Sequence, residues 1–461
     1  MPGRGARHRH RRRPVRTAPL RPRGRPRRGT GPRAHRHVRP QPPDPGERRA
    51  APPPRPGAPR CPHVAPRPAG ADVVKVLHVI GDSEFGGGSR VILAVAAGAR
   101  DAGHEVEVLT TDARFQEALE ARGIRVVDRD WVRRQPHPVR DARGVAALTR
   151  YLRQGRHDLV HTHTTRGGVL GRLAGHRAGT PIVVHTAHGF AVAERDARWK
   201  QRAVFAVERV AARWCDHVVA VSHHHARWAA DEGVRPRGSL RVIPNGVPAP
   251  APAGPLPLPG RRGPIVVHVG RIAPGKGVDV LLDAFTDLRR GDGQGADAHL
   301  VVAGDGPAMP ALTEQARLLG LGDDVTWLGH RDDVPAVLAA ADVVVLPSLR
   351  EGLSLALLEA MAAARAIVAT DLGGTAEALV GGRAGVLVPP GDAGAVTAAL
   401  RELLADPDRR TRLAARALAE FEARYRLERM VGAYRDLYAE LGAATPGAGR
   451  LGAATRRSAS R

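Results

Sequence analysis

The sequence has little cysteine, few aromatic residues and almost no lysine. Two cysteines, Cys61 and Cys215, occur in 461 residues, so neither a disulfide framework nor a cysteine-based zinc site is expected. Aromatic residues make up 3% of the chain against 43% hydrophobic residues, so its cores must consist mainly of alanine, valine and leucine. The lysines are Lys75, Lys200 and Lys276, and their rarity among 71 basic residues draws attention to each of them.

Long apolar runs are missing as well. No stretch of about 18 apolar residues occurs, so no membrane-spanning helix is expected. The arginines near the N-terminus are not followed by an apolar stretch, so no secretory signal is expected. Together with the scarcity of cysteine, these absences favour a cytoplasmic protein.

The formal net charge of +25 is concentrated at one end of the chain. Residues 1–70 contain 20 arginines, one aspartate and one glutamate, a charge of +18, which leaves +7 for the rest. Because this stretch has almost no aliphatic side chains to bury, residues 1–72 are expected to be disordered. Such an arm can bind nucleic acid or anionic lipid, or it can result from a translation start placed too far upstream.

From residue 73 onward, short apolar runs alternate with helical patterns. Strands are predicted at 73–80, 104–110, 159–163, 182–185 and 217–221, and again at 265–269, 299–303, 325–328, 343–346, 366–370 and 386–388. Strands separated by helices are typical of parallel sheets with helices on both faces. A segment rich in proline and glycine divides the two series and is interpreted as a stiff linker.

The sequence therefore predicts an α/β protein with two doubly wound domains. We expect an N-terminal domain over 73–247, a linker over 248–264 and a C-terminal domain over 265–425. A C-terminal helix over 426–442 is expected to pack back toward the first domain, and residues 443–461 to form a disordered tail. Ligands bind at the carboxyl ends of the strands in such sheets, so a cleft between the domains is the expected site.

The strongest local pattern follows the predicted strand 343–346. Glu351 lies in the loop after this strand, and Glu359 lies about two helical turns further on, so both carboxylates can face one ligand. The backbone amides that follow Gly352 are at a helix N-terminus, where unpaired N–H groups favour a phosphate. An ordinary capped amphipathic helix is the alternative interpretation of this segment.

A basic loop follows the first strand of the second domain. Arg271 and Lys276 place two cations in a loop with glycine and proline, which suits a diphosphate that must leave as an anion. The Gly-Lys-Ser/Thr ending of a Walker A loop is missing. A solvated basic turn is the alternative.

Three glycines, Gly86, Gly87 and Gly88, open the first predicted helix. Glycine allows a ligand to approach the backbone closely, although a mobile loop explains the same residues. The spacing does not match G-x-G-x-x-G, so a nicotinamide or flavin cofactor is not expected.

Histidines gather in the first domain. His161 and His163 share one face of a predicted strand, and His185 and His188 flank the end of the next. No carboxylate or cysteine has a convincing metal-ligand spacing, so no metal site is predicted. His188 follows the carboxyl end of a strand and is predicted to lie at the cleft, whereas the others are interpreted as structural.

The predicted helix 195–214 combines six basic residues with Trp199, Phe205 and Trp214. A basic helix with large apolar side chains can lie on an anionic membrane. Packing of the apolar side chains in the core, with the basic face in solvent, is the other interpretation.

Taken together, these segments resemble the retaining glycosyltransferases of family 4, of the bacterial type that builds cell-surface polysaccharide or glycolipid. The resemblance covers about residues 74–440. It rests on Gly86-Gly87, His188-Gly189, Ser222, Pro244-Asn245-Gly246-Val247, Gly270-Arg271 with Lys276, Gly304-Asp305-Gly306-Pro307, Leu328-Gly329, Glu351-Gly352 with Glu359-Ala360-Met361, and Gly373-Gly374 with Glu377. Ala364-Arg365 departs from the family pattern, in which a glycine usually follows Glu-Ala-Met-Ala.

The resemblance implies a GT-B fold, in which two Rossmann-like domains face a central cleft. It also implies a metal-independent enzyme without a cofactor that transfers a sugar with retention. The implied donor is a nucleotide-diphosphate sugar, most commonly a UDP-sugar, and the implied acceptor is a glycan or a polyprenyl- or lipid-linked molecule. Such an enzyme is expected in the cytoplasm or at the inner face of the plasma membrane.

The resemblance also assigns roles to residues of this sequence. The implied catalytic residues are His188, Arg271, Lys276 and Glu351. The implied donor-binding residues are Gly270, Arg331, Gly352, Leu353, Ser354, Leu355 and Glu359. Gly86, Gly87 and Gly88 are implied to line the acceptor or phosphate side.

Two other functions stay open at this point. A nucleotide-sugar epimerase or hydrolase can have the same fold, although no additional carboxylate or histidine base is evident near the sugar. A protein that binds nucleic acid through residues 1–70 would keep its affinity in that fragment and lose it steeply with salt.

Overall fold

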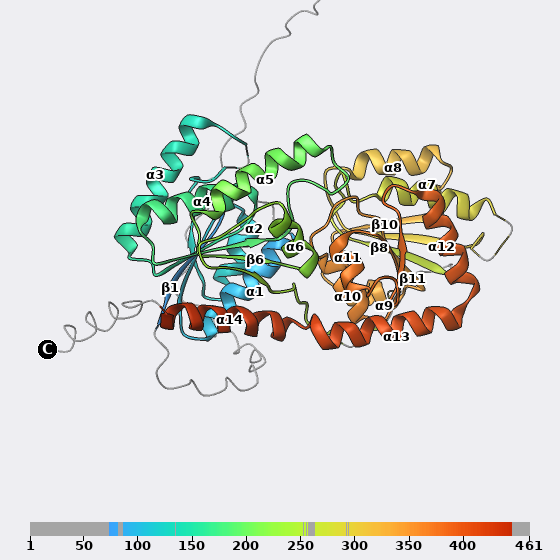
Figure 1. Ribbon diagram of the computed structural model, residues 1–461. Coiled ribbons are helices and arrows are strands. Elements are labelled where there is room, and N and C mark those ends of the chain that lie inside the picture. The colour runs from blue at the N-terminus through green and yellow to red at the C-terminus, as the bar shows by residue number, and fades with distance from the viewer. Residues whose placement is uncertain are drawn as a thin grey trace, which may run out of the picture. The chain divides into compact units, whose positions relative to one another are not determined.

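The computed structural model describes residues 73–81, 86–133, 135–251, 253–254, 256, 263–291, 293 and 295–444, which all lie in one compact unit, residues 66–461. Figure 1 shows the arrangement of the helices and strands. The predictions made for residues 1–72 and 445–461 lie outside the described residues. No helix in the described ranges has the length and apolar character needed to cross a bilayer.

The first domain is built on a parallel sheet whose described strands follow the order β3-β2-β1-β4-β5-β6-β7. These strands are β1 (Lys75–Gly81), β2 (Glu105–Thr110), β3 (Arg125–Val127), β4 (Leu159–Thr162), β5 (Ile182–Ala187), β6 (His217–Ala220) and β7 (Ser239–Val242). Its helices are α1 (Gly87–Asp101), α2 (Ala113–Glu120), α3 (Pro138–Gly155), α4 (Thr165–Ala178), α5 (Arg198–Ala212) and α6 (His223–Asp231). The strand order reverses between β1 and β4, the position at which doubly wound sheets bind ligands.

The second domain repeats this plan with the order β10-β9-β8-β11-β12-β13. Its strands are β8 (Ile265–Val269), β9 (His299–Ala303), β10 (Val325–Gly329), β11 (Val343–Leu346), β12 (Ala366–Thr370) and β13 (Val386–Val388). Its helices are α7 (Val278–Arg289), α8 (Met309–Leu318), the short 3₁₀ helix η1 (Gly322–Asp324), α9 (Val334–Ala339), α10 (Leu355–Ala362), α11 (Gly373–Ala378), α12 (Ala393–Ala405) and α13 (Pro407–Arg424). The predicted α/β fold with two parallel sheets is confirmed.

Two strands of the first sheet, β3 and β7, are absent from the predicted set. Both lie at an edge of the sheet and carry an arginine, Arg125 or Arg241, that reaches a glutamate. An edge strand need not be apolar on both faces, so its sequence lacks the continuous hydrophobic run that marks a central strand.

Alternate residues of each central strand supply the cores on the two faces of the sheet. In β1, Val76 and Ile80 pack with α1, α2 and the last helix, α14 (Leu427–Ala444), whereas Leu77 and Val79 pack with α3 and α4. The period of two in a strand separates these sets. Consequently His78 lies on the same face as Val76 and Ile80, beneath α14.

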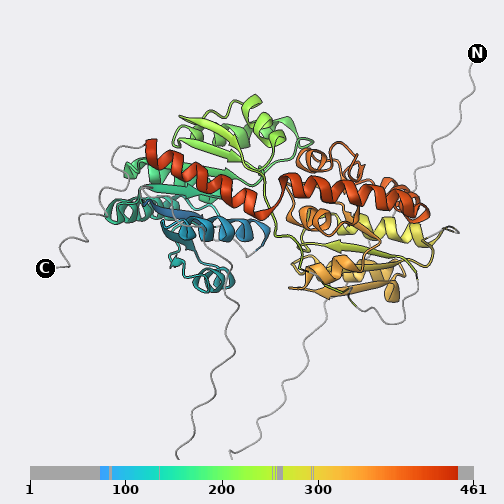
Figure 2. The ribbon, with the colours of Figure 1, turned by 90° about the horizontal axis from the view of Figure 1, so that it is seen from below.

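The chain passes between the domains at two adjacent places. Val247, at the end of the first domain, donates its backbone N–H to Tyr425 O at 3.0 Å and accepts from the Leu427 N–H at 2.9 Å. A Cβ atom on Gly246 would lie 2.6 Å from the carbonyl oxygen of Arg426, so a glycine is needed at this crossing. Helix α13 ends at this point and α14 begins, as Figure 2 shows for the two red helices.

Helix α14 packs on the first domain through its tyrosines. Tyr438 forms a hydrogen bond with His161 Nδ1, and the Tyr434 hydroxyl lies 3.0 Å from Thr186 Oγ1. Gly98 of α1 allows the two helices to approach, because a Cβ atom there would lie 2.3 Å from Val431 Cγ1. The helix continues to Ala444, two residues beyond the predicted boundary.

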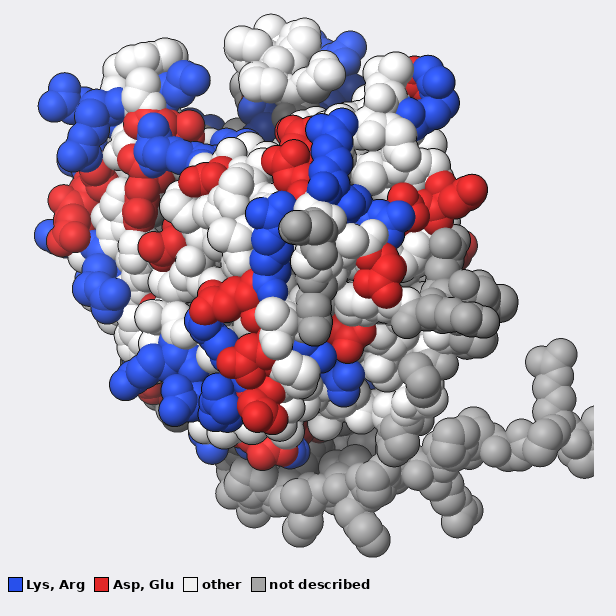
Figure 3. All heavy atoms as spheres, turned by 90° about the vertical axis from the view of Figure 1, so that its right-hand side faces the viewer, with Lys and Arg blue, Asp and Glu red and all other residues white. Residues whose placement is uncertain are grey.

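Charged side chains on the body of the protein differ in distribution from those of the N-terminal stretch. On the face shown in Figure 3, basic and acidic side chains are interspersed. This face therefore lacks an extended area of one sign, in contrast to residues 1–70 of the sequence.

Replacing Tyr438 with phenylalanine tests the contact between α14 and the sheet. The Y438F variant leaves His161 Nδ1 buried without this partner, so we expect the free energy of unfolding to fall by about 1–3 kcal/mol in urea denaturation. Gly432→Ala is the control on the same helix, because a Cβ atom there meets nothing within 4 Å and alanine should raise helix stability by about 1 kcal/mol. Equal stabilities of Y438F and the unmodified protein would contradict this account.

Candidate active site

The two domains come into backbone contact where their strands end. Gly352 follows β11 in the second domain, and a Cβ atom on it would lie 1.9 Å from the carbonyl oxygen of His188, which follows β5. A Cβ atom on Gly374 would in turn lie 1.9 Å from the carbonyl oxygen of Gly352. Because no side chain can be accommodated at these positions, glycine allows the carboxyl ends of the two sheets to meet.

A cavity of about 570 Å³ lies at this contact and is lined by residues of both domains. The first domain contributes His188, Gly189, Phe190, Glu194, Arg195 and Trp228, and the second contributes Arg350, Glu351, Gly352, Asp371 and Gly373, among others. Of the predicted site residues, His188, Glu351 and Gly352 therefore share one cavity. Sequence reasoning missed Glu194, Trp228 and Asp371, because nothing local distinguishes them from surface residues.

The basic loop after β8 lies against the loop after β11. Lys276 forms an ion pair with Glu351, and Ser348 Oγ donates a hydrogen bond to Glu351 Oε1 at 3.0 Å. The backbone N–H of Leu349 donates to Gly275 O at 2.8 Å and joins the two loops. The structure thus brings together an ammonium group and a carboxylate 75 residues apart in the sequence. Arg271 lies at the start of the same loop, directly after Gly270.

The second predicted carboxylate has a partner from the other domain. Glu359 of α10 lies 2.7 Å from Arg90 of α1, and its side chain is 14% exposed. Gly87 lies next to α10, because a Cβ atom on it would be 3.7 Å from Leu355. The first turns of α1 and α10 therefore lie near each other. Arg90 was missed by sequence reasoning, because it is one of many arginines in this chain.

The starts of these two helices keep backbone donors available. The N-cap residues Gly86 of α1 and Ser354 of α10 make no side-chain capping hydrogen bond. The first N–H groups of a helix have no partner within the helix and, with the helix dipole, favour an anion. Gly86, Gly87 and Gly88 thus lie at the start of one helix, and residues 352–355 at the start of the other.

One ring nitrogen of His188 contacts a second histidine. Its Nε2 lies 3.2 Å from His163 Nδ1, and its Nδ1 is shielded from solvent without a hydrogen-bond partner among the described residues. Burial lowers the pKa of His188 to about 4, because the charged imidazolium is disfavoured away from water. His188 is therefore neutral near pH 7 and carries one N–H and one lone pair.

Arg331 and Glu377 do not line this cavity, and each has partners elsewhere. Arg331 follows β10 and forms two hydrogen bonds with Asp333, of 2.7 and 2.6 Å. Glu377 accepts hydrogen bonds from the backbone N–H groups of His223 and His224 at the start of α6, at 3.1 and 2.8 Å. Glu377 thereby links α11 of the second domain to α6 of the first, which the sequence did not predict.

Burial of several histidines makes the stability of the protein depend on pH. The pKa is lowered to about 3 for His78 and about 4 for His188, and lies well below its usual value for His161, His163 and His185, in each case mainly through burial. In the unfolded chain these groups bind protons below about pH 6.5. The unfolded state thus binds more protons than the folded state as the pH falls from about 6.5.

We therefore expect the free energy of unfolding to fall between about pH 6.5 and 5, with a slope of about 1.4 kcal/mol per pH unit for each such histidine. Denaturant titrations at several pH values measure this slope. Glu107, whose pKa is lowered to about 2, changes the free energy of unfolding only at a lower pH than this window. A stability that stays flat on acidification would refute the prediction.

Comparisons with known families and proteins agree with this architecture. The family described as Glycosyltransferase Family 4 matches residues 85–249, and the family described as Glycosyl transferases group 1 matches residues 263–406. The chain is 34% identical over 403 residues to a D-inositol 3-phosphate glycosyltransferase of Salinispora tropica. The matched region covers 79% of this chain and 83% of that protein.

Two other relatives match over a shorter part of their length. The alpha-D-kanosaminyltransferase of Streptomyces kanamyceticus is 37% identical over 180 residues, which is 38% of this chain and 46% of that protein. The UDP-Gal:alpha-D-GlcNAc-diphosphoundecaprenol alpha-1,3-galactosyltransferase of Escherichia coli is 33% identical over 247 residues, 51% of this chain and 63% of that protein. This chain therefore spans about half to two thirds of these two relatives.

A solved structure shares the fold. The crystal structure of Anabaena Alr3699/HepE in complex with UDP-glucose superposes with a TM-score of 0.66 at 22% identity, covering 80% of this chain and 100% of that one. At this identity the likeness concerns the fold.

Proposed function

The chain belongs to the family 4 glycosyltransferases with the GT-B fold, and on this basis we propose that it transfers a sugar, with retention, from a nucleotide-diphosphate sugar to a glycan or lipid-linked acceptor. The observation that carries the proposal is the cavity at the interdomain contact, where His188 and Glu351 come from opposite domains. Beside it, Glu351 pairs with Lys276 of the basic loop. The proposed donor is a UDP-sugar.

The donor diphosphate is proposed to bind between the basic loop and the start of α10. Arg271 and Lys276 supply fixed positive charge for a leaving group that gains negative charge as its bond to the sugar breaks. The uncapped N–H groups at the start of α10 supply hydrogen bonds to the same group. This set of donors can stabilise the leaving diphosphate without a metal ion.

Two carboxylates are proposed to bind the hydroxyl groups of the donor. Glu351, 16% exposed, lies beside the cavity and would accept from the sugar, while Glu359 in α10 would accept from the ribose. In the structure each carboxylate is paired with a cation, Lys276 or Arg90. Donor binding would therefore exchange these ion pairs, releasing Lys276 toward phosphate and Glu351 toward the sugar.

The transfer itself is proposed to occur on one face of the sugar. The bond from the anomeric carbon to the diphosphate oxygen breaks through an oxocarbenium-like state, and the acceptor oxygen bonds to the same face. The proton of the acceptor hydroxyl passes to the departing diphosphate oxygen. No side-chain base is needed, which agrees with the pKa of His188, lowered to about 4, because an imidazole that binds a proton so weakly is a poor base near pH 7.

The cavity is proposed to receive the acceptor. Phe190 and Trp228 form an apolar wall, with ring centroids 5.5 Å apart in an edge-to-face arrangement, and Glu194 and Asp371 offer carboxylates to hydroxyl groups. An aromatic wall combined with polar groups suits a sugar, which has apolar faces and a polar rim.

A peripheral contact with the inner face of the plasma membrane is proposed through α5. One side of this helix is packed in the protein, with Phe205 fully buried. The other side exposes Trp199 by 68%, Val207 by 49% and Val210 by 46%, next to exposed Lys200 and other basic side chains. Exposed apolar groups among cations favour an anionic lipid surface, where a lipid-linked acceptor would be found.

The donor assignment predicts the effect of removing either cation of the basic loop. We expect Arg271→Ala and Lys276→Ala each to lower kcat at least about 10²-fold, the scale for loss of one electrostatic stabiliser of the transition state. Release of nucleoside diphosphate from a panel of UDP-, GDP- and ADP-sugars, with product analysis, measures this effect and separates transfer from epimerisation or hydrolysis.

Arg317→Ala is the matched control, because Arg317 is an exposed arginine of α8 that pairs only locally with Glu314 among the described residues. It should keep the rate of the unmodified enzyme. Near-normal rates in both Arg271→Ala and Lys276→Ala would refute the assignment of the basic loop.

The membrane proposal predicts weaker binding when the exposed apolar groups of α5 are lost. We expect the double variant Trp199→Ala/Val210→Ser to bind vesicles of phosphatidylglycerol and phosphatidylcholine at least about tenfold more weakly in sedimentation assays. Leu318→Ala removes an apolar side chain that is 71% exposed on α8 and should bind as the unmodified protein does. Equal binding of the double variant and this control would exclude α5 as the contact.

A further inference from the structure

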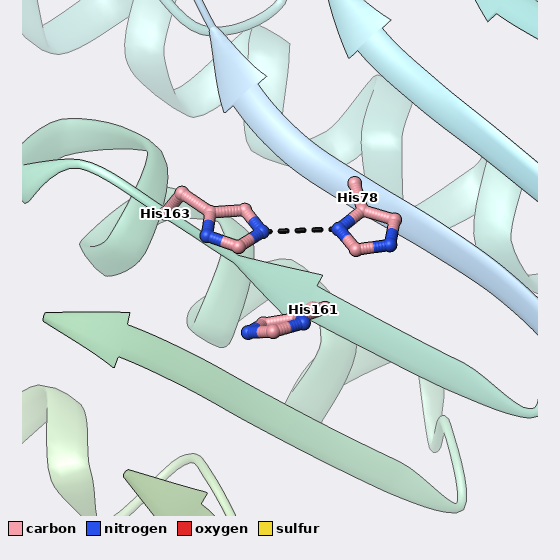
Figure 4. A group of neighbouring side chains, drawn as sticks. All are labelled: His78, His161 and His163. Atoms are coloured by element: carbon pink, nitrogen blue, oxygen red, sulfur yellow. Dashed lines mark hydrogen bonds between the residues drawn. The ribbon is translucent and has the colours of Figure 1, made fainter. Parts of the chain in front are cut away.

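A row of three buried imidazoles leads from the cavity into the core. His188 follows β5 and lines the cavity, His163 follows β4, and His78 lies in β1. His188 Nε2 lies 3.2 Å from His163 Nδ1, and His163 Nε2 lies 3.0 Å from His78 Nδ1. Figure 4 shows the nitrogens of His163 and His78 pointing toward each other from neighbouring strands. We refer to His78, His163 and His188 as the histidine row.

Both ends of the histidine row lack a protein partner. His188 Nδ1 and His78 Nε2 are buried and have no hydrogen bond to any described residue. Buried polar atoms without a partner are rare, and those of a functional site are often completed by a ligand. At the cavity end, His188 Nδ1 is thus the atom of the row that can form a hydrogen bond with a substrate.

A fourth histidine lies beside the row without joining it. The ring of His161 lies 4.2 Å from that of His163, and the three nitrogens of His78, His161 and His163 are close enough for a metal ion. Both nitrogens of His161 are already bonded, Nδ1 to Tyr438 and Nε2 to Thr186 Oγ1 at 2.7 Å. In Figure 4 the His161 ring lies below the other two and makes no bond to them. The geometry therefore favours a hydrogen-bonded row over a metal centre.

Neutral imidazoles in a row must all point the same way. Each has one N–H and one lone pair, and burial keeps all three rings uncharged by lowering their pKa values. If His78 Nδ1 donates to His163, then His163 Nδ1 donates to His188, and the hydrogen of His188 resides on Nδ1. If the bonds run the other way, His188 Nδ1 carries only a lone pair.

The two ends of the row differ in their surroundings. Either state leaves one N–H without an acceptor among the described residues, at His188 Nδ1 or at His78 Nε2. His188 lines the cavity, where a ligand oxygen can accept this hydrogen, whereas His78 is buried in the core, so the unpaired N–H is less tolerated at His78. The favoured state therefore leaves the lone pair at His78 Nε2 and places the hydrogen of His188 on Nδ1.

We propose that His163, held in place by His78, is a positioning residue that fixes the tautomer and orientation of His188, so that His188 Nδ1–H donates a hydrogen bond to an oxygen of the sugar substrate. This inference rests on the proposed glycosyl transfer, since it names the substrate oxygen as the acceptor. It adds a role for two residues that lie outside the cavity and outside the reacting atoms.

The test replaces His163 with phenylalanine and, separately, with asparagine. Phenylalanine fills the space but cannot donate to His188 Nε2, so kcat should fall at least about tenfold, with little change in KM for the donor. Asparagine can donate through its amide and should restore part of the lost rate. In spectra of enzyme with ¹⁵N-labelled histidine, the hydrogen of His188 should reside on Nδ1 in the unmodified enzyme and be shared between Nδ1 and Nε2 in H163F, where no donor faces Nε2. His188→Gln assigns the signals.

His157→Gln is the matched control for loss of a buried histidine. His157 bonds Glu107 at 3.0 Å, away from the cavity, so this variant should lose stability while keeping kcat and the His188 signals. An unchanged tautomer and an unchanged kcat in folded H163F would overturn the proposal. Stoichiometric zinc binding that is abolished in H163F and H161Q would overturn it in favour of a metal centre.

The same assays separate this inference from the proposed function. Binding of UDP, measured by calorimetry, depends on the basic loop and should be equal in H163F and the unmodified enzyme. If the unmodified enzyme transfers no sugar from any donor of the panel, the proposed function fails. If it transfers sugar and H163F does so equally well with the same His188 tautomer, only the role of the histidine row fails.

Discussion

The backbone contact between Gly352 and the carbonyl group of His188 is the constraint on which the rest of the site depends. With 1.9 Å between that oxygen and the place of a Cβ atom, only glycine permits the ends of the two sheets to meet. This contact places Glu351, one residue before Gly352, beside His188 and closes the cavity between the domains. Any side chain at this position would separate the two halves of the site.

The C-terminal helix also supports the site, through its packing on the first sheet. Helix α14 leaves the second domain at the paired crossing of Val247 and Arg426 and packs on the face that carries the histidines. Tyr438 and Tyr434 of this helix form hydrogen bonds with His161 and Thr186. His163 instead contacts His78 through one ring nitrogen and His188 through the other. A polar network within this core is stable because nearly all its members are hydrogen-bonded.

The carboxylates of the site are paired with cations of the protein. Glu351 is paired with Lys276 of its own domain, whereas Glu359 is paired with Arg90 of the other. Each pair lowers the free energy of a partly buried carboxylate, since an uncompensated charge there would be disfavoured. Under the proposed function, the phosphate and hydroxyl groups of a nucleotide sugar exchange these pairs for new ones.

The sequence by itself determined the alternation of strands and helices in two series and the loops that carry Arg271, Lys276, Glu351 and His188, because strand periodicity and loops at strand ends are local features. Only the tertiary structure showed the edge strands β3 and β7, the partner of Glu359, the role of Tyr438 and the position of His78. His78 lies in an apolar strand 85 residues before His163, and Arg90 lies far from Glu359 along the chain. Their meeting depends on the order of strands in the sheet and on the approach of two domains, which no local pattern encodes.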